Sequence, residues 1–189
     1  MSPQTLLVVG GVRAGKSAFA VARARAHGGR VVFVATAEAG DADMAERIVR
    51  HRAERPAAWR TVEVPVELPS VLTALEGEAD VVVVDCLNLW VANLLHERTR
   101  STEDDLVSDA AELAAVARRA PFSLILVSNE VGWGIHPETA LGRRFRDALG
   151  LVNQAAARAV GEVVLMVAGC PLTVKSPDAH PSSGGGPPP

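Results

Sequence analysis

The sequence contains little cysteine and no marked excess of positive charge. Its 189 residues include two cysteines, Cys86 and Cys170. Two cysteines cannot form a disulfide framework, and these two lack the spacing of metal ligands, so we interpret both as small buried thiols. The 19 Lys and Arg residues face 22 Asp and Glu residues, and the net charge is −3. Because a nucleic-acid-binding domain usually carries a basic patch, we expect no nucleic-acid partner.

Long hydrophobic runs are also missing. No apolar run reaches the ~18 residues that are needed to span a bilayer. The first residues lead directly into a strand-like segment, without the basic segment and cleavage site of a secretory signal. We therefore expect a cytoplasmic protein with no membrane span. The apolar fraction of 48% is that of a globular protein, and the length suffices for one domain with a full core.

Short apolar runs alternate with longer helical patterns along the chain. The runs predict strands over residues 6–9, 31–34, 61–64, 81–84, 124–127 and 163–167, and an edge strand over 172–174. The helical patterns run from the end of the first loop to residue 27 and over 41–55, 69–75, 87–95, 102–119 and 137–160, with a break near Gly150 left open. This alternation predicts an α/β domain with a mostly parallel sheet covered on both faces.

The end of the chain differs in composition from the rest. Residues 176–189 are rich in Gly, Pro and Ser and lack apolar residues that could anchor them. Such a segment cannot bury enough surface to offset the entropy of ordering. We expect a folded domain over residues 1–175 and a disordered tail over 176–189.

The first strand leads into a glycine-rich octet. Residues 10–17 read Gly10-Gly11-Val12-Arg13-Ala14-Gly15-Lys16-Ser17 and fit the P-loop pattern. Glycines allow the backbone N–H groups to turn toward phosphate oxygens, and the following helix adds its positive end. In this pattern the lysine contacts the β- and γ-phosphates and the serine hydroxyl ligates Mg²⁺. The octet predicts a nucleotide site with Lys16 and Ser17 at its centre.

Two further strand ends carry polar residues. Asp85 ends an apolar run, and in P-loop proteins such an acid holds Mg²⁺ directly or through water. The alternative is that Asp85 caps the next helix. Thr36 follows the second strand at the edge where ligands bind, but Thr is equally common as a strand residue. After the fifth strand, Asn129 and Glu130 fit a contact with substrate or metal. The alternative is that they cap the turn, but the surrounding glycines and Trp133 favour a binding loop.

The predicted helix over residues 41–55 carries His51 among arginines. A neutral imidazole can attack phosphorus and form a covalent intermediate, and neighbouring arginines neutralise phosphate charge. A single helical histidine is more often a surface residue, so spacing alone gives only weak support to catalysis by His51.

Together, these segments resemble one family, the bifunctional adenosylcobinamide kinase/adenosylcobinamide-phosphate guanylyltransferases of cobalamin biosynthesis. The resemblance extends from the P-loop to about Lys175. Its specific parts are the segment from Met44 through His51 to Arg55-Pro56, the Asp85-Cys86-Leu87 and Asn93-Leu94-Leu95 stretches, and the Ser128-Asn129-Glu130-Val131-Gly132 loop. Trp133 stands where the family usually has a smaller or aliphatic residue.

The resemblance implies a RecA-like, three-layer P-loop fold and two reactions. ATP or GTP would phosphorylate adenosylcobinamide, and GMP from GTP would then pass to the product through His51. It implies a corrinoid substrate, GTP, ATP and Mg²⁺ as ligands, and a homotrimer. Besides the P-loop, the matching nucleotide-binding residues are Ala35, Thr36, Ala37, Arg52, Ala53, Glu54, Arg55, Glu63 and Asp85, with Ser17 and Asp85 at the metal. The alternatives are a RecA-like ATPase or another small-molecule kinase without guanylyl transfer.

Overall fold

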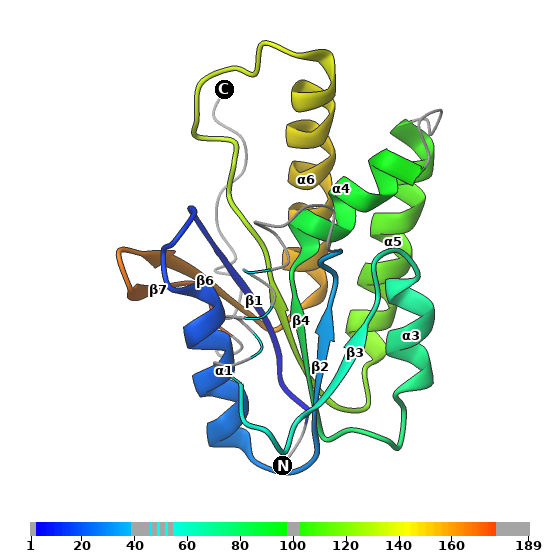
Figure 1. The fold of residues 1–189 in the computed structure, drawn as a ribbon, viewed down its shortest axis with the longest axis vertical. Coiled ribbons are helices and arrows are strands. Elements are labelled where there is room, and N and C mark those ends of the chain that lie inside the picture. Colours follow the sequence, from blue (N-terminus) through cyan, green and yellow to red (C-terminus); the bar gives the residue numbers. More distant parts are fainter. Residues whose placement is uncertain are drawn as a thin grey trace, which may run out of the picture.

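The structure is a computed structural model that describes residues 3–38, 46, 49, 52, 55–97 and 103–176. Its middle layer is a seven-stranded sheet in the order β3-β2-β4-β5-β1-β6-β7 (Figure 1). The first six strands in this order pair in parallel, and β7 pairs with β6 in the antiparallel direction. The strands are β1 Thr5–Gly10, β2 Val31–Ala35, β3 Arg60–Glu63, β4 Val81–Asp85, β5 Ser123–Val127, β6 Glu162–Val167 and β7 Cys170–Lys175.

Helices cover both faces of this sheet. Within the described residues these are α1 Lys16–His27, α3 Leu68–Ala74, α4 Leu87–Glu97, α5 Glu103–Arg119 and α6 Ala140–Ala159. Alternate residues of each strand point to opposite faces, so Val82 and Val84 pack with α3 to α6 whereas Val81 and Val83 pack on the α1 side (Figure 1). This double burial explains why the strands are near-continuous runs of Val, Leu and Ile.

The sequence-based elements are largely confirmed. All six expected core strands are present, and the expected edge strand is β7. Helix α6 is continuous through Gly150, beside which there is open space, and it begins at Ala140 because the Thr139 side chain accepts a hydrogen bond from Gly142 N. Of the predicted helix 41–55, only residues 46, 49 and 52 are described as helical; the expected tail from 177 onward lies outside the described residues.

Two expectations about exposure have different outcomes. Cys86 is buried as predicted, but Cys170 is exposed because β7 is the outer strand of the sheet. The interpretation of both cysteines as buried is therefore wrong for Cys170. None of the helices in the described part of the chain combines the length and apolar character needed to span a membrane.

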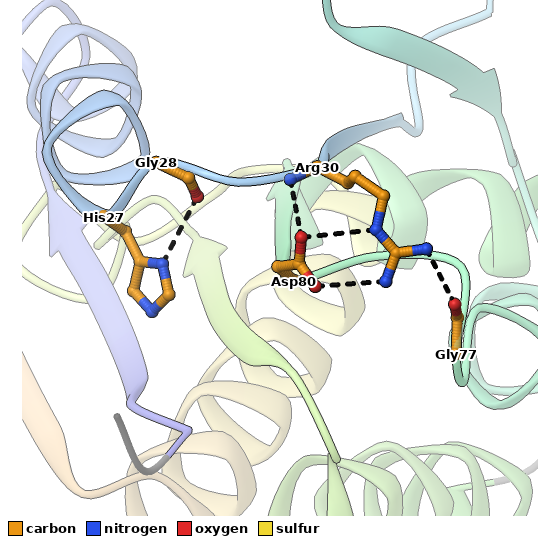
Figure 2. Close-up of polar contacts among 5 residues, drawn as sticks. All are labelled: His27, Gly28, Arg30, Gly77 and Asp80. Atoms are coloured by element: carbon orange, nitrogen blue, oxygen red, sulfur yellow. Dashed lines mark hydrogen bonds and ion pairs between the residues drawn. The ribbon is translucent and has the colours of Figure 1, made fainter.

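The amino edge of the sheet is held together by side chains near the surface. The carboxylate of Asp80, just before β4, accepts hydrogen bonds from Arg30 N, Nε and Nη2, just before β2 (Figure 2). Arg30 Nη1 donates to Gly77 O at 2.9 Å. These bonds join the starts of two adjacent parallel strands.

Candidate nucleotide site

The P-loop connects β1 to α1 at the carboxyl edge of the sheet (Figure 1). Gly10 has a φ of 151°, and a Cβ there would lie 2.5 Å from Met166 O of the neighbouring strand β6. Gly15, just before α1, has a φ of 93°, in the left-handed region that glycine adopts without strain. Two of the predicted P-loop glycines are therefore required by close approach or by backbone conformation.

Lys16 is enclosed by this loop. Its exposed fraction is 8%, and its Nζ donates a hydrogen bond to Gly11 O at 2.7 Å. Burial lowers the pKa of the Lys16 ammonium from its ordinary value of 10.5, whereas the charges of Cys86 and Asp85 act in the opposite direction. The loop thus holds a desolvated cation, which interacts more strongly with an incoming phosphate than a solvated one does.

Several predicted site residues line one cavity of about 410 Å³ beside the P-loop. Ser17 and Asp85 line it together with Phe33, Arg55 and the α1 residues Ala18, Val21, Ala22 and Arg25. The volume lies in the range of about 300–1,000 Å³ that is typical of ligand pockets. The fold therefore brings together three candidates, Ser17, Arg55 and Asp85, that are far apart in the sequence.

Arg55 lies against an aromatic ring in this cavity. Its guanidinium carbon is 3.5 Å from the centroid of the Phe33 ring. Such a cation–π contact favours one orientation of the planar guanidinium beside the other residues that line the cavity. Phe33 was not singled out by the sequence, where it reads as an ordinary core residue of a buried strand.

The strand register places the remaining strand-end candidates in one row. Glu63 of β3, Ala35 of β2 and Asp85 of β4 are adjacent across the sheet, and Val127 of β5 follows. Thr36 comes next after this row but is fully buried. Its Oγ1 donates to Cys86 O at 2.7 Å and accepts from Cys86 N at 2.8 Å. The Thr36 hydroxyl is thus committed to the backbone after Asp85, and its contact with nucleotide stays a prediction.

The loop after β5 contacts the P-loop directly. Glu130 N donates to Gly10 O at 3.1 Å, and the Glu130 carboxylate accepts from Gly132 N at 2.7 Å. The turn-capping alternative for Glu130 is therefore confirmed. Asn153 of α6 holds this loop, accepting from Ser128 Oγ at 2.6 Å and donating to Asn129 O at 3.0 Å.

The remaining candidates lie in the P-loop, after β2 and in the segment before Arg55, and some of them are outside the described residues. Val12 and Arg13 are exposed, whereas Ala14 is buried and its carbonyl accepts from Gly169 N. Arg52 is helical and exposed, and Ala37 follows Thr36 outside the strand. His51, Ala53 and Glu54 lie outside the described residues.

No group of three or more His, Cys, Asp and Glu side chains that could hold a metal occurs among the described residues. The cavity nevertheless has one hydroxyl, Ser17, and one carboxylate, Asp85. Mg²⁺ usually takes one or two such oxygens and completes its shell with water and substrate phosphates. This donor set fits Mg²⁺ bound together with a nucleotide rather than an all-protein metal cage.

A family model described as "Cobinamide kinase / cobinamide phosphate guanyltransferase" matches residues 6–174 of the chain. The chain is 40% identical to the bifunctional adenosylcobalamin biosynthesis protein CobP of Pseudomonas aeruginosa, over 89% of this chain and 96% of that protein. It is 38% identical to CobU of Escherichia coli, over 90% of this chain and 99% of that protein.

A solved structure described as the crystal structure of the RadB recombinase resembles this fold, with a TM-score of 0.50 at 17% identity. The match covers 87% of this chain and 74% of that one, and it shows the RecA-like P-loop fold alone. With the family match over residues 6–174 and relatives near 40% identity over nearly their whole length, the chain belongs to the cobinamide kinase / cobinamide phosphate guanyltransferase family.

Proposed function

We propose that this enzyme phosphorylates adenosylcobinamide and then transfers GMP to the product, giving adenosylcobinamide-GDP. The observation that carries this proposal is the convergence of Lys16, Ser17, Arg55 and Asp85 at one edge of the sheet in a chain of this family. ATP or GTP would serve the first reaction and GTP the second. The family description names cobinamide and cobinamide phosphate, and these are the corrinoids that we propose as substrates.

In the kinase reaction, the substrate hydroxyl attacks the γ-phosphorus and the bond to the β-phosphate oxygen breaks. The nucleoside diphosphate leaves, and the hydroxyl proton is released. Catalysis of this kind consists mainly of positioning and charge neutralisation. Lys16 would contact the β- and γ-phosphates, and the Arg55 guanidinium provides a further cation in the cavity beside the P-loop.

In the transferase reaction, an imidazole nitrogen of His51 attacks the α-phosphorus of GTP and pyrophosphate leaves. A phosphate oxygen of adenosylcobinamide phosphate then attacks the histidine-bound GMP, the P–N bond breaks, and His51 is restored. Ser17 and Asp85 would hold Mg²⁺, which neutralises phosphate charge when bound. The family resemblance also supports a homotrimer, and we propose a cytoplasmic location for this biosynthetic enzyme.

The direct test is labelling with GTP that carries ³²P at the α-position. We expect a protein-bound label that is acid-labile and base-stable, as a phosphoramidate is, and that is absent from His51→Ala. GTP labelled at the γ-position should leave no label on the protein. The matched control is His96→Ala, because His96 is an exposed histidine at the end of α4. Equal labelling of His51→Ala and the wild type would overturn the covalent mechanism.

The same preparation separates the alternative functions. Transfer of γ-phosphate to a small molecule without any α-label indicates a kinase that lacks guanylyl transfer. Rapid hydrolysis without corrinoid indicates a RecA-like ATPase. Dependence of both reactions on cobinamide supports the proposed function.

A further inference from the structure

The hydroxyl of Thr36 forms a closed pair of hydrogen bonds with the residue after Asp85. Thr36 follows β2, Cys86 follows β4, and the two strands are adjacent. The hydroxyl satisfies both backbone groups of Cys86, at 2.7 and 2.8 Å, and Thr36 N donates to Asp85 O at 3.2 Å. A hydroxyl has one proton to donate, and here it is given to the Cys86 carbonyl. The side chain of Thr36 is thus fixed to the backbone that carries Asp85.

Asn93 of α4 supplies the second half of this arrangement. Its Nδ2 donates to Thr36 O at 2.8 Å and to Pro65 O at 3.0 Å. These carbonyls belong to the connections that follow β2 and β3, so one amide ties both to the helix that starts after Asp85. The carbonyl, the N–H and the hydroxyl of Thr36 are all bonded, and the residue has no exposed surface.

The position of Asp85 depends on this backbone. Asp85 is the last residue of β4 and lines the cavity that also contains Ser17. A rotation of the Asp85–Cys86 backbone would move its carboxylate relative to Ser17 and to the buried Lys16 ammonium. Buried polar groups that lose one partner are costly, so the paired bonds favour a single backbone geometry.

We propose that Thr36 and Asn93 are positioning residues that hold the Asp85 carboxylate in place for Mg²⁺-bound nucleotide. This inference rests on the proposed role of Asp85 at the metal. Thr36 then acts on the nucleotide site by fixing the backbone of Asp85 and Cys86, and not by contacting phosphate directly.

The test compares binding of a fluorescent GTP analogue in saturating Mg²⁺ and in EDTA, which gives the factor by which Mg²⁺ strengthens binding. Thr36→Val keeps the shape of the side chain and removes the hydroxyl, and we expect it to reduce this factor roughly tenfold or more. Thr36→Ser keeps the hydroxyl and should restore most of the factor. Thr73→Val is the matched control, because Thr73 is an exposed residue of α3 whose hydroxyl donates to Pro69 O of the same helix, and it does not line the cavity.

A double-mutant cycle with Asp85→Asn shows whether Thr36 acts through Asp85. We expect Thr36→Val to add little to the loss that Asp85→Asn causes by itself. If Asp85→Asn lowers the factor and Thr36→Val does not, or if the two losses add, the positioning role is overturned while the proposed function stands. If Asp85→Asn has no effect, the metal role of Asp85 fails and the positioning role fails with it.

Thermal unfolding of each variant serves as the control that shows whether the variant is folded. Should Thr36→Val not fold, Asn93→Ala replaces it in the same cycle, because it removes both bonds to the strand connections and leaves the hydroxyl pair. We expect a smaller reduction in the same direction. An unchanged factor in a folded Asn93→Ala variant would contradict the role of Asn93.

Discussion

The Arg30–Asp80 pair at the amino edge of the sheet and the Thr36 network at its carboxyl edge both tie adjacent strands together, but the first is exposed and the second is buried. At the amino edge, the Arg30 and Asp80 side chains remain 60% and 44% exposed (Figure 2). At the carboxyl edge, Thr36 and Ser128 are fully buried and Lys16 is nearly so. Water can replace a broken bond of the exposed Arg30–Asp80 pair but not one of the buried Thr36 network. We therefore expect the buried network to restrict geometry more than the exposed pair does.

The largest contrast concerns the two thiols. Burial raises the pKa of the Cys86 thiol at the carboxyl edge to about 12, from an ordinary value of 9.0, whereas Cys170 on β7 is exposed. At pH 8 the thiolate fraction of Cys86 is therefore roughly 10³-fold lower than that of an unperturbed thiol. We expect Ellman's reagent to modify Cys170 rapidly and Cys86 only after denaturation. Rapid modification of both thiols in the native protein would contradict the burial of Cys86.

Replacing Lys16 should have opposite effects on activity and on stability. Lys16→Met removes the cation that contacts phosphate, and we expect kinase activity to fall roughly 10²–10³-fold. It also removes a buried ammonium whose pKa is lowered by desolvation, so the melting temperature should rise by about 2–4 °C. Lys175→Met is the control, since the Lys175 ammonium donates to the carbonyls of Ala157 and Val160, away from the cavity. Its melting temperature should fall.

Replacing Asn153 tests the loop after β5, which is hydrogen-bonded to the P-loop. Asn153→Leu leaves the buried Ser128 hydroxyl and the Asn129 carbonyl without their partner, and we expect a loss of about 1–3 kcal/mol in unfolding free energy. Urea denaturation measures it. Gln154→Leu is the neighbouring control, because Gln154 is exposed and its side chain accepts a hydrogen bond from Arg158 Nη1 at 3.4 Å on the surface of α6. A change beyond about 0.5 kcal/mol in this control would indicate a general effect of the helix.

The smallest effect is expected at the amino edge. The Arg30 hydrogen bonds lower the pKa of Asp80 below its ordinary value of 3.8. This contribution to stability is complete above pH 3.8 and is lost as the pH falls through the lower folded-state pKa. Asp80→Asn should therefore lower the melting temperature by less than about 2 °C at pH 7, and less in high salt. A difference from wild type that persists at pH 2 would show that the carboxylate charge is not its cause.

Residues that act through local sequence were predicted most completely. Gly10 to Ser17 run from the end of β1 through the loop into the start of α1, so eight consecutive residues contain the information needed to recognise the P-loop. Asp85 could also be recognised locally, because it directly follows the apolar run of residues 81–84. By contrast, Gly150 was a plausible break in a helix, and the structure shows that packing of α6 on α4 and α5 overrides its low propensity.

Residues that act through distant partners were not assigned. The stretch that contains Asn93 belongs to the family resemblance, but no local pattern shows that Asn93 bonds to Thr36, 57 residues away, or that Phe33 contacts Arg55, 22 residues away. The apolar run before Cys170 predicts a buried thiol, but that run is β6, and Cys170 itself lies on the outer strand β7. Exposure of an edge strand depends on strand order, which local periodicity does not determine.

The sequence by itself determined the P-loop, the alternation of strands and helices, and the family to which the chain belongs. These depend on residue types at short spacing, where backbone freedom, charge and apolar periodicity act directly. Only the tertiary structure decided that Asp85 and Arg55 share a cavity with Ser17, that Thr36 is bonded to Cys86, and that Cys170 is exposed. Parallel pairing brings strand ends together from distant parts of the chain, and burial then leaves each polar group there dependent on the partner that packing provides.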